Sequence, residues 1–206
     1  MLPETRPVRE KIRAAAVQLF AEMGYHAAPL RDIAKLANIQ AASIYYHYPS
    51  KQALLVEIMD THMRQLNASL EQIIVLPIGS AERLYEAIAS HIRLHTTHKA
   101  EFFIIDTEIR ALDNEHREQI IALRDQYEHL LQSLLQEGVD QGALRPTDVK
   151  IASYAVIAMC TEVAAWFRSP GRLTVQQIID IYSQFIAQGL LTQDLSGQKP
   201  AESART

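Results

Sequence analysis

Residues 30–51 have the sequence LRDIAKLANIQAASIYYHYPSK, and this stretch decides the fold of the N-terminal part of the chain. Apolar residues at helical spacing predict a short helix that starts behind Pro29. Asn38 is expected to end it, because asparagine tolerates a left-handed backbone conformation. A second short helix, about Gln40 to His47, follows and stops before Pro49. Two short helices joined by so tight a turn predict a helix-turn-helix unit.

A preceding helix completes a three-helix unit. Apolar residues from Ile12 to Met23 recur at helical spacing, and Gly24 follows as a C-terminal cap. In such units the third helix enters the major groove of DNA. The candidate DNA contacts are Arg31, Gln40, Ala41, Ala42, Ser43, Tyr45, Tyr46, His47 and Lys51. On three short helices alone, a small subdomain whose tyrosines only pack fits about equally well.

The candidate contacts have different expected roles. Ala41, Ala42 and Ser43 are small, so the backbone of the third helix can come close to the bases. Gln40 or His47 could reach a base edge. Phosphates would be bound by the hydroxyl groups of the tyrosines and by the ammonium group of Lys51. The core of the unit is expected to contain Ile33, Ala34, Ile44 and Tyr48.

Six further helices are predicted from apolar periodicity and capping residues. Ser50, Ser80 and Asp113 are candidate N-caps, and Thr174 with Gln177 forms a capping-box pattern. The predicted helices run from Ser50 to about Leu76, Ser80 to about His98, about Ala100 to Leu112, Asp113 to Gly138–Gly142, Thr147 to about Phe167, and Thr174 to about Leu191. The fold class is therefore all-α, with about nine helices arranged as a three-helix head and a helical-bundle body.

Composition agrees with a helical globular protein. The 206 residues are 48% hydrophobic and include only 7 Gly and 8 Pro. The single cysteine, Cys160, excludes a disulfide framework or a multi-cysteine zinc site within one chain. The longest uncharged run lies between Lys150 and Glu162, shorter than the roughly 20 apolar residues of a membrane span. Since no signal-peptide pattern follows Met1, we expect a cytoplasmic protein without a membrane partner.

The charge distribution distinguishes the head of the chain from its body. Up to Lys51 the chain has 7 Lys and Arg against 4 acids, a net charge of +3, so the remainder of a chain with net charge −4 carries −7. A mildly basic head on an acidic body suits a head that meets phosphates. We predict a DNA-binding domain over residues 1–50, a ligand-binding and dimerisation domain over 51–192, and a disordered tail over 193–206.

The head resembles the TetR family of repressors. The resemblance lies in Leu19-Phe20-Ala21-Glu22-x-Gly24-Tyr25, Arg31-Asp32-Ile33-Ala34 and Ile44-Tyr45-Tyr46-His47-Tyr48-Pro49-Ser50-Lys51. It implies an all-helical homodimer with a variable ligand-binding body. This chain departs from the family pattern at Ala28-Pro29, where Thr or Ser is usual, at Asn38, where Gly is usual, and at Gln40, where Ser is common. The departures imply an unusual operator.

The body is similar to TetR-type regulators that sense acyl-CoA thioesters of lipid, sterol or aromatic-acid breakdown. The similarity lies in Arg93, Phe102, Glu108, Arg110-Ala111-Leu112, Arg124, Tyr127, Trp166-Phe167-Arg168 and Gly171-Arg172-Leu173. An acyl-CoA needs an apolar cavity and arginines near its mouth to pair with phosphates. The candidate ligand-binding residues are His95, Phe102, Arg110, Tyr127, Trp166, Arg168 and Arg172. The arginines beside Trp166 fit a plain surface position equally well.

The last two helices are the expected dimer interface, because the helix over residues 147–167 is apolar on several faces that need cover. The alternative is that both helices only complete the core of a monomer. A dimer would place two heads about 34 Å apart, on a near-palindromic operator. We therefore predict a repressor that a small molecule releases from DNA, with no resident cofactor or metal. Two regulator alternatives remain: an effector-free regulator that acts with a protein partner, and a drug-responsive or metal-responsive one. A metal would be held by His91, His95 and His98 near Glu101, and the same histidines could instead line a polar pocket.

An enzyme is not expected. The sequence contains no glycine-rich phosphate loop, no Gly-x-Ser-x-Gly elbow and no His-Glu-x-x-His motif.

Overall fold

The computed structural model describes residues 7–145 and 148–190. These residues form nine α-helices and a short 3-10 helix, without a strand among them. The helices are α1 (Val8–Met23), α2 (Leu30–Leu36), α3 (Ala41–His47), α4 (Lys51–Ile74), α5 (Ser80–Thr97), α6 (Lys99–Glu108), η1 (Ile109–Ala111), α7 (Asn114–Asp140), α8 (Val149–Trp166) and α9 (Val175–Leu190). The all-α prediction is confirmed. The predicted tail over residues 193–206 lies outside the described residues.

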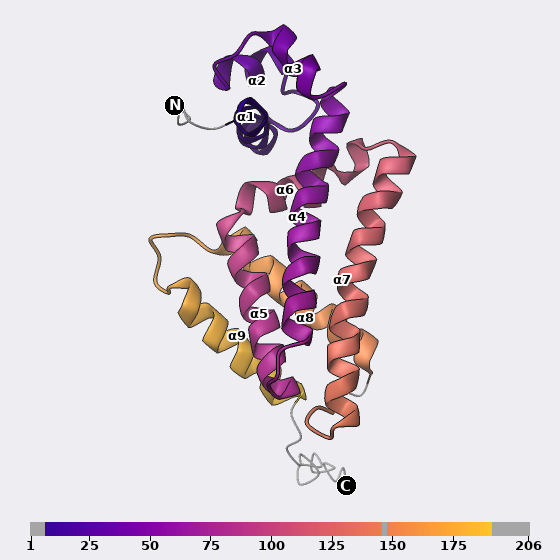
Figure 1. Ribbon diagram of the computed structural model, residues 1–206. Helices are drawn as coiled ribbons and strands as arrows, with labels where there is room; N and C mark the ends of the chain where they lie inside the picture. Colours follow the sequence, from indigo (N-terminus) through magenta and orange to yellow (C-terminus); the bar gives the residue numbers. More distant parts are fainter. Residues whose placement is uncertain (1–6, 146–147, 191–206) are drawn as a thin grey trace, which may run out of the picture.

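The head consists of α1, α2 and α3, which stand at the upper end of the molecule in Figure 1. Gly24 ends α1 at a φ of +83°, a conformation that favours glycine, and its N–H donates to the carbonyl of Phe20. Asn38 has a φ of +56° in the turn between α2 and α3, as predicted. Ile33, Ala34, Ile44 and Tyr48 are buried, so the predicted core of the head is confirmed.

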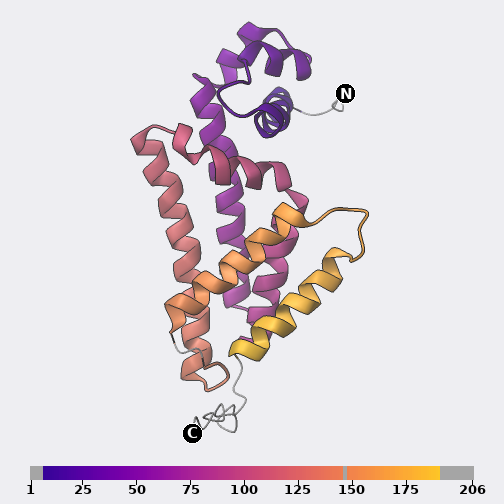
Figure 2. The ribbon, with the colours of Figure 1, turned by 180° about the vertical axis from the view of Figure 1, so that it is seen from behind.

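α4 connects the head to the body. Ser50 caps it as predicted, since the Ser50 hydroxyl accepts a hydrogen bond from the N–H of Ala53 at 3.0 Å. The helix then runs 24 residues along the body and packs against α7, α5 and α6 (Figure 1). The view from behind shows α8 and α9 on the opposite side of the body, where both pack on α5 (Figure 2). The predicted domain boundary at residue 50 coincides with the start of α4.

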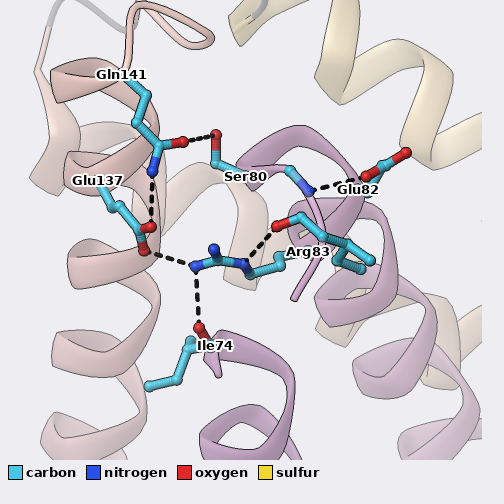
Figure 3. A network of polar contacts seen from close by, with 8 residues as sticks. Ile74, Ser80, Glu82, Arg83, Glu137 and Gln141 are labelled. Carbon is cyan, nitrogen blue, oxygen red and sulfur yellow. Dashed lines mark hydrogen bonds and ion pairs between the residues drawn. The ribbon is translucent and has the colours of Figure 1, made fainter. Parts of the chain in front are cut away.

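A polar network holds the far ends of α4, α5 and α7 together (Figure 3). The guanidinium of Arg83 donates to the carbonyl of Ile74 at the end of α4 and to the carboxylate of Glu137 on α7. Gln141 joins Glu137 to the hydroxyl of Ser80. Because the last carbonyls of a helix have no partner within it, Arg83 stabilises the C-terminus of α4 while it cross-links three helices.

Some predicted helix ends need correction. The sixth helix was expected to reach Leu112, but the α-helix ends at Glu108 and a 3-10 turn follows. The cap of α5 is Gly79, whose N–H donates to Glu82, whereas Ser80 is the first helical residue. Asp113 and the Thr174–Gln177 pair cap α7 and α9 as predicted. Thr147 lies outside the described residues, and the side chain of Asp148 caps α8.

α8 is the most apolar helix in the described part of the chain. By length and composition its 18 residues could cross a membrane, but only 33% of that window is buried, and core helices of soluble proteins pass the same test. Large apolar side chains on α8 and α9 remain exposed, namely Ile151, Tyr154, Trp166, Ile181 and Phe185. The described residues of a single chain therefore leave an apolar face uncovered on these two helices.

Candidate DNA-reading surface and effector cavity

The exposed side of α3 has the features of a DNA-reading surface. Tyr45 and Tyr46 are 61% and 88% exposed, although tyrosine rings usually bury most of their area. Gln40, Ala41 and Ala42 at the start of the helix are also exposed. On the opposite side Ile44 and Tyr48 pack into the core of the head. The helix is thus fixed from behind and presents small and aromatic residues to the solvent.

The remaining candidate contacts surround α3. Arg31 on α2 is exposed and lies 3.6 Å from the carboxylate of Asp32. Ser43 and His47 are half-buried, and the ring of His47 packs edge-on against Tyr46. Lys51 is also half-buried, because its ammonium group donates to the carbonyl of His26 and lies 4.5 Å from the ring centre of Tyr25. Lys51 therefore ties α4 to the loop after α1, in addition to any contact with DNA.

A cavity of about 350 Å³ lies in the body. Five helices line it: α4 with His62, Met63 and Leu66; α5 with His91 and His95; α6 with Phe102, Ile105 and Asp106; α7 with Arg124, Asp125, Tyr127 and Glu128; and α8 with Tyr154, Ile157, Ala158, Thr161 and Glu162. Its volume is in the lower part of the range of about 300–1,000 Å³ that is typical of small-molecule sites. The cavity can therefore hold a small ligand or the end of a larger one.

The inner wall of the cavity carries three histidines. His62, His91 and His95 are each at most 5% exposed, and the ring centres of His91 and His95 lie 4.4 Å apart. The ring of His91 is held by the hydroxyl of Tyr127 at 2.8 Å and the hydroxyl of Thr161 at 3.0 Å. Burial lowers the pKa of His62 to about 4 and that of His91 to about 3, and it also lowers the pKa of His95. All three imidazoles are therefore uncharged at neutral pH.

The rim of the cavity is acidic. Asp106, Asp125, Glu128 and Glu162 belong to the lining, whereas Arg124 is its one Lys or Arg side chain among the described residues. The guanidinium of Arg124 donates to the carbonyl of Ile105, and burial lowers its pKa. Four carboxylates against one guanidinium favour an uncharged or cationic group over an anion at this rim.

Three of the seven predicted ligand-binding residues meet at the cavity: His95, Phe102 and Tyr127. The other four lie elsewhere. Arg110 is exposed in the 3-10 turn, and Trp166, Arg168 and Arg172 are exposed where the chain leaves α8. The guanidinium of Arg168 donates to the carbonyls of Ala165 and Phe167, so it caps the end of α8. These four residues are outside the cavity lining, and their role in ligand binding stays a prediction.

Several lining residues were missed by sequence reasoning, above all His62 and Thr161. His62 stands in the apolar stripe of α4 between Ile58 and Met63, and a polar residue on a buried helix face was the available signal. The described residues contain no group of three His, Cys, Asp or Glu side chains that could hold a metal ion. His98 does not line the cavity, so the metal-responsive alternative gains no support.

Ion pairs connect the cavity walls to the head. Glu101 on α6, next to the cavity residue Phe102, lies 3.6 Å from the guanidinium of Arg13 on α1. Glu57 on α4 accepts hydrogen bonds from the hydroxyl of Tyr48, at 2.6 Å, and from Arg9 on α1. A displacement of α4 or α6 would therefore move the head.

Two family models match the chain, one over the head and one over the body. Residues 12–58 match the model of bacterial regulatory proteins of the tetR family, and residues 78–190 match the model of the tetracyclin repressor-like C-terminal domain. The second match covers more than half of the chain. The chain belongs to the TetR family. The resemblance inferred from the head is thus confirmed, and this TetR-family chain has its helix-turn-helix unit in the first match and most of the cavity in the second.

Three proteins illustrate the similarity. The transcriptional repressor KstR2 of Mycobacterium tuberculosis is 29% identical over 185 residues, which cover 88% of this chain and 92% of KstR2. The structure of the TetR-family regulator PfmR from Thermus thermophilus has 31% identity and a TM-score of 0.80, covering 86% of this chain and 97% of PfmR. AibR, solved with isovaleryl coenzyme A and operator DNA, has 27% identity and a TM-score of 0.78, covering 88% and 97%. KstR2 is a transcriptional repressor and PfmR a transcriptional regulator, in agreement with the expectation of a regulator for this chain.

Proposed function

We propose that the protein is a ligand-responsive transcriptional repressor that acts on DNA in the cytoplasm. The observation that carries the proposal is that α4 begins at the reading unit and also lines the cavity with His62, Met63 and Leu66. A molecule that fills more than the existing cavity would displace side chains of α4 and α6, both of which contact α1 in the head. Binding in the body would therefore change the position of α3 and release the operator.

The repressor would act as a homodimer through α8 and α9. The exposed apolar residues Ile151 and Trp166 on α8 and Ile181 and Phe185 on α9 supply a face for a two-fold partner. Two heads would then meet successive major grooves, about 34 Å apart, on a near-palindromic operator. Tyr154 lies both in this face and in the cavity lining, so effector binding could also act on the dimer geometry.

An acyl-CoA thioester is the first candidate effector. AibR was solved with isovaleryl coenzyme A, and a cavity of about 350 Å³ suits an acyl group while the nucleotide stays outside. An uncharged or cationic free molecule is the second candidate. It is favoured by the four carboxylates at the rim, which would repel the phosphates of coenzyme A.

Operator release separates the two candidates. The operator would first be selected from random DNA duplexes, and release would then be followed by fluorescence anisotropy with isovaleryl-CoA, longer acyl-CoAs, the free acids, and neutral and cationic small molecules. An effector at a hundredfold its Kd should also stabilise the protein by about 2.7 kcal/mol. Release by a thioester but not by its free acid supports the first candidate. If nothing on the panel releases the operator or stabilises the protein, an effector-free regulator is indicated instead.

A further inference from the structure

Two buried nitrogens in the cavity wall have no hydrogen-bond partner among the residues that the structure describes. They are Nε2 of His62 and Nδ1 of His95, and both belong to side chains that are at most 5% exposed. A buried polar atom without a partner costs about 1–3 kcal/mol, so native proteins keep few of them. An apolar side chain would avoid this cost. The two nitrogens are therefore available to bond a molecule that enters the cavity.

The third histidine differs from this pair. His91 has both ring nitrogens bonded, one to Tyr127 and one to Thr161, which fixes the orientation of its ring. The ring of His95 packs against His91 on one side and edge-on against Phe102 on another, with ring centres 4.4 Å and 4.9 Å apart. The ring of His62 lies 5.2 Å from that of His95. The pair is thus held in place by neighbours that do not use its free nitrogens.

The chemistry of the pair selects an uncharged oxygen. Burial keeps the imidazoles neutral, so each ring has one N–H donor and one nitrogen acceptor and carries no charge that would attract an anion. Around the pair, Met63, Leu66, Phe102 and Ile157 supply apolar surface. A ketone or thioester carbonyl accepts a hydrogen bond, and a hydroxyl both donates and accepts. A carboxylate would lose its hydration without gaining a cation from the pair, and the guanidinium of Arg124 in the lining is bonded to the carbonyl of Ile105.

We propose that His62 and His95 form a polar anchor in the cavity, which binds the uncharged carbonyl or hydroxyl oxygen of an otherwise apolar ligand. The proposal rests on the cavity being the effector site of the proposed repressor. The anchor gives the cavity a specificity that its volume alone does not provide. Apolar molecules that place one neutral oxygen beside the pair are expected to bind. A plain hydrocarbon or a carboxylate of the same shape is expected to bind weakly.

A matched set of probes tests the anchor. Cyclooctanone, cyclooctanol, cyclooctane and cyclooctanecarboxylate would be titrated into the full chain, with the histidine ring ¹⁵N resonances followed by NMR. The ketone and the alcohol are expected to bind about tenfold more tightly than the other two, as one net hydrogen bond of about 1.4 kcal/mol predicts. They should shift the ring nitrogens of His62 and His95. The anchor is overturned if the hydrocarbon or the carboxylate binds equally well, or if no probe binds.

Variants locate the effect. His62→Leu should lose about tenfold in affinity for cyclooctanone with no loss for cyclooctane. His62→Gln keeps a donor and an acceptor and should retain part of the affinity for cyclooctanone. It replaces the leucine variant in the test if that variant does not fold. His129→Leu, on the exposed side of α7, is the matched control. Equal ketone affinity in all variants, or stoichiometric binding of Zn²⁺ by the pair in place of the ketone, overturns the anchor.

Operator release is scored separately. If a thioester releases the operator but ketone affinity does not depend on His62, the anchor is wrong and the proposed repressor function is supported. If the ketone binds through His62 but no compound releases DNA, the anchor stands and the ligand-responsive function fails.

Discussion

The reading surface of α3 and the wall of the effector cavity use polar side chains in opposite ways. Tyr45 and Tyr46 are exposed, and neither belongs to the buried core of the described residues. His91 and Tyr127 are buried and bonded to each other, so they hold the body together as well as shape the cavity. A residue of the first kind can change with little effect on the fold, whereas a residue of the second kind serves stability and function at once. The two regions should therefore respond differently to pH and to mutation.

The largest expected difference is in the response to acid. His62 and His91 have pKa values of about 4 and 3 in the folded chain because burial disfavours the charged ring, against about 6.5 when unfolded. Between these values the unfolded chain binds protons and the folded chain does not, so stability falls as pH falls. From pH 7.5 to pH 5 each imidazole should remove about 2 kcal/mol from the free energy of unfolding.

Urea unfolding at the two pH values and constant ionic strength measures this loss. The charged groups near His62 are Glu101, which opposes the pKa shift, and His98 and Arg13, which add to it. The N–H of His116 lowers the pKa of Asp113, so the contribution of Asp113 to folding stability is lost only at a pH below the two that are compared. His62→Gln should remove the part of this pH-dependent loss of stability that comes from His62, about 2 kcal/mol. Equal stability at both pH values would mean that the cavity histidines take up protons in the folded chain.

The next effect concerns the hydroxyl of Tyr127. Tyr127→Phe keeps the ring but leaves Nδ1 of His91 without its partner at 2.8 Å, which should cost about 2 kcal/mol of folding stability. Operator affinity should stay unchanged, because the site is in the body. The control is Tyr182→Phe, since the hydroxyl of Tyr182 has no hydrogen bond in the described part of the chain. Equal loss in both variants would remove the special role of the His91–Tyr127 pair.

The same contrast explains what could be predicted from the sequence. The reading surface was predictable because α2, the turn and α3 are continuous in the chain, so spacing and capping residues define it. The cavity draws on five helices, and packing decides which of their residues meet. His95 and Tyr127 were found, but His62 was missed because it lies 33 residues from His95 on another helix. Trp166 and Arg168 lie outside the cavity lining, because α8 ends beside them and both residues are exposed.

Tyr46→Ala tests the reading surface. Its ring is 88% exposed, so the free energy of unfolding should change by less than about 0.5 kcal/mol. Operator affinity should fall about tenfold if the hydroxyl donates to a phosphate, since hydrogen bonds to charged groups contribute about 1.5 kcal/mol or more. Fluorescence anisotropy with the selected operator measures this, and Phe103→Ala, an exposed aromatic residue on α6, is the control. Unchanged affinity would place Tyr46 outside the interface.

The smallest effect is expected at Asn38, which sets the turn between α2 and α3 at a φ of +56°. Glycine would adopt this conformation without steric cost, but it also increases the entropy of the unfolded chain, so Asn38→Gly should change stability by about 0.5 kcal/mol or less. Alanine adopts this left-handed conformation only at a steric cost, so Asn38→Ala should lower the free energy of unfolding by about 1 kcal/mol. Thermal and urea unfolding of the pair measures the difference. Because the side chain is exposed, both variants should bind the operator as before if the turn only orients α3. Weaker binding by the glycine variant, at unchanged stability, would instead show that the rigidity of this turn is part of how the reading surface meets DNA.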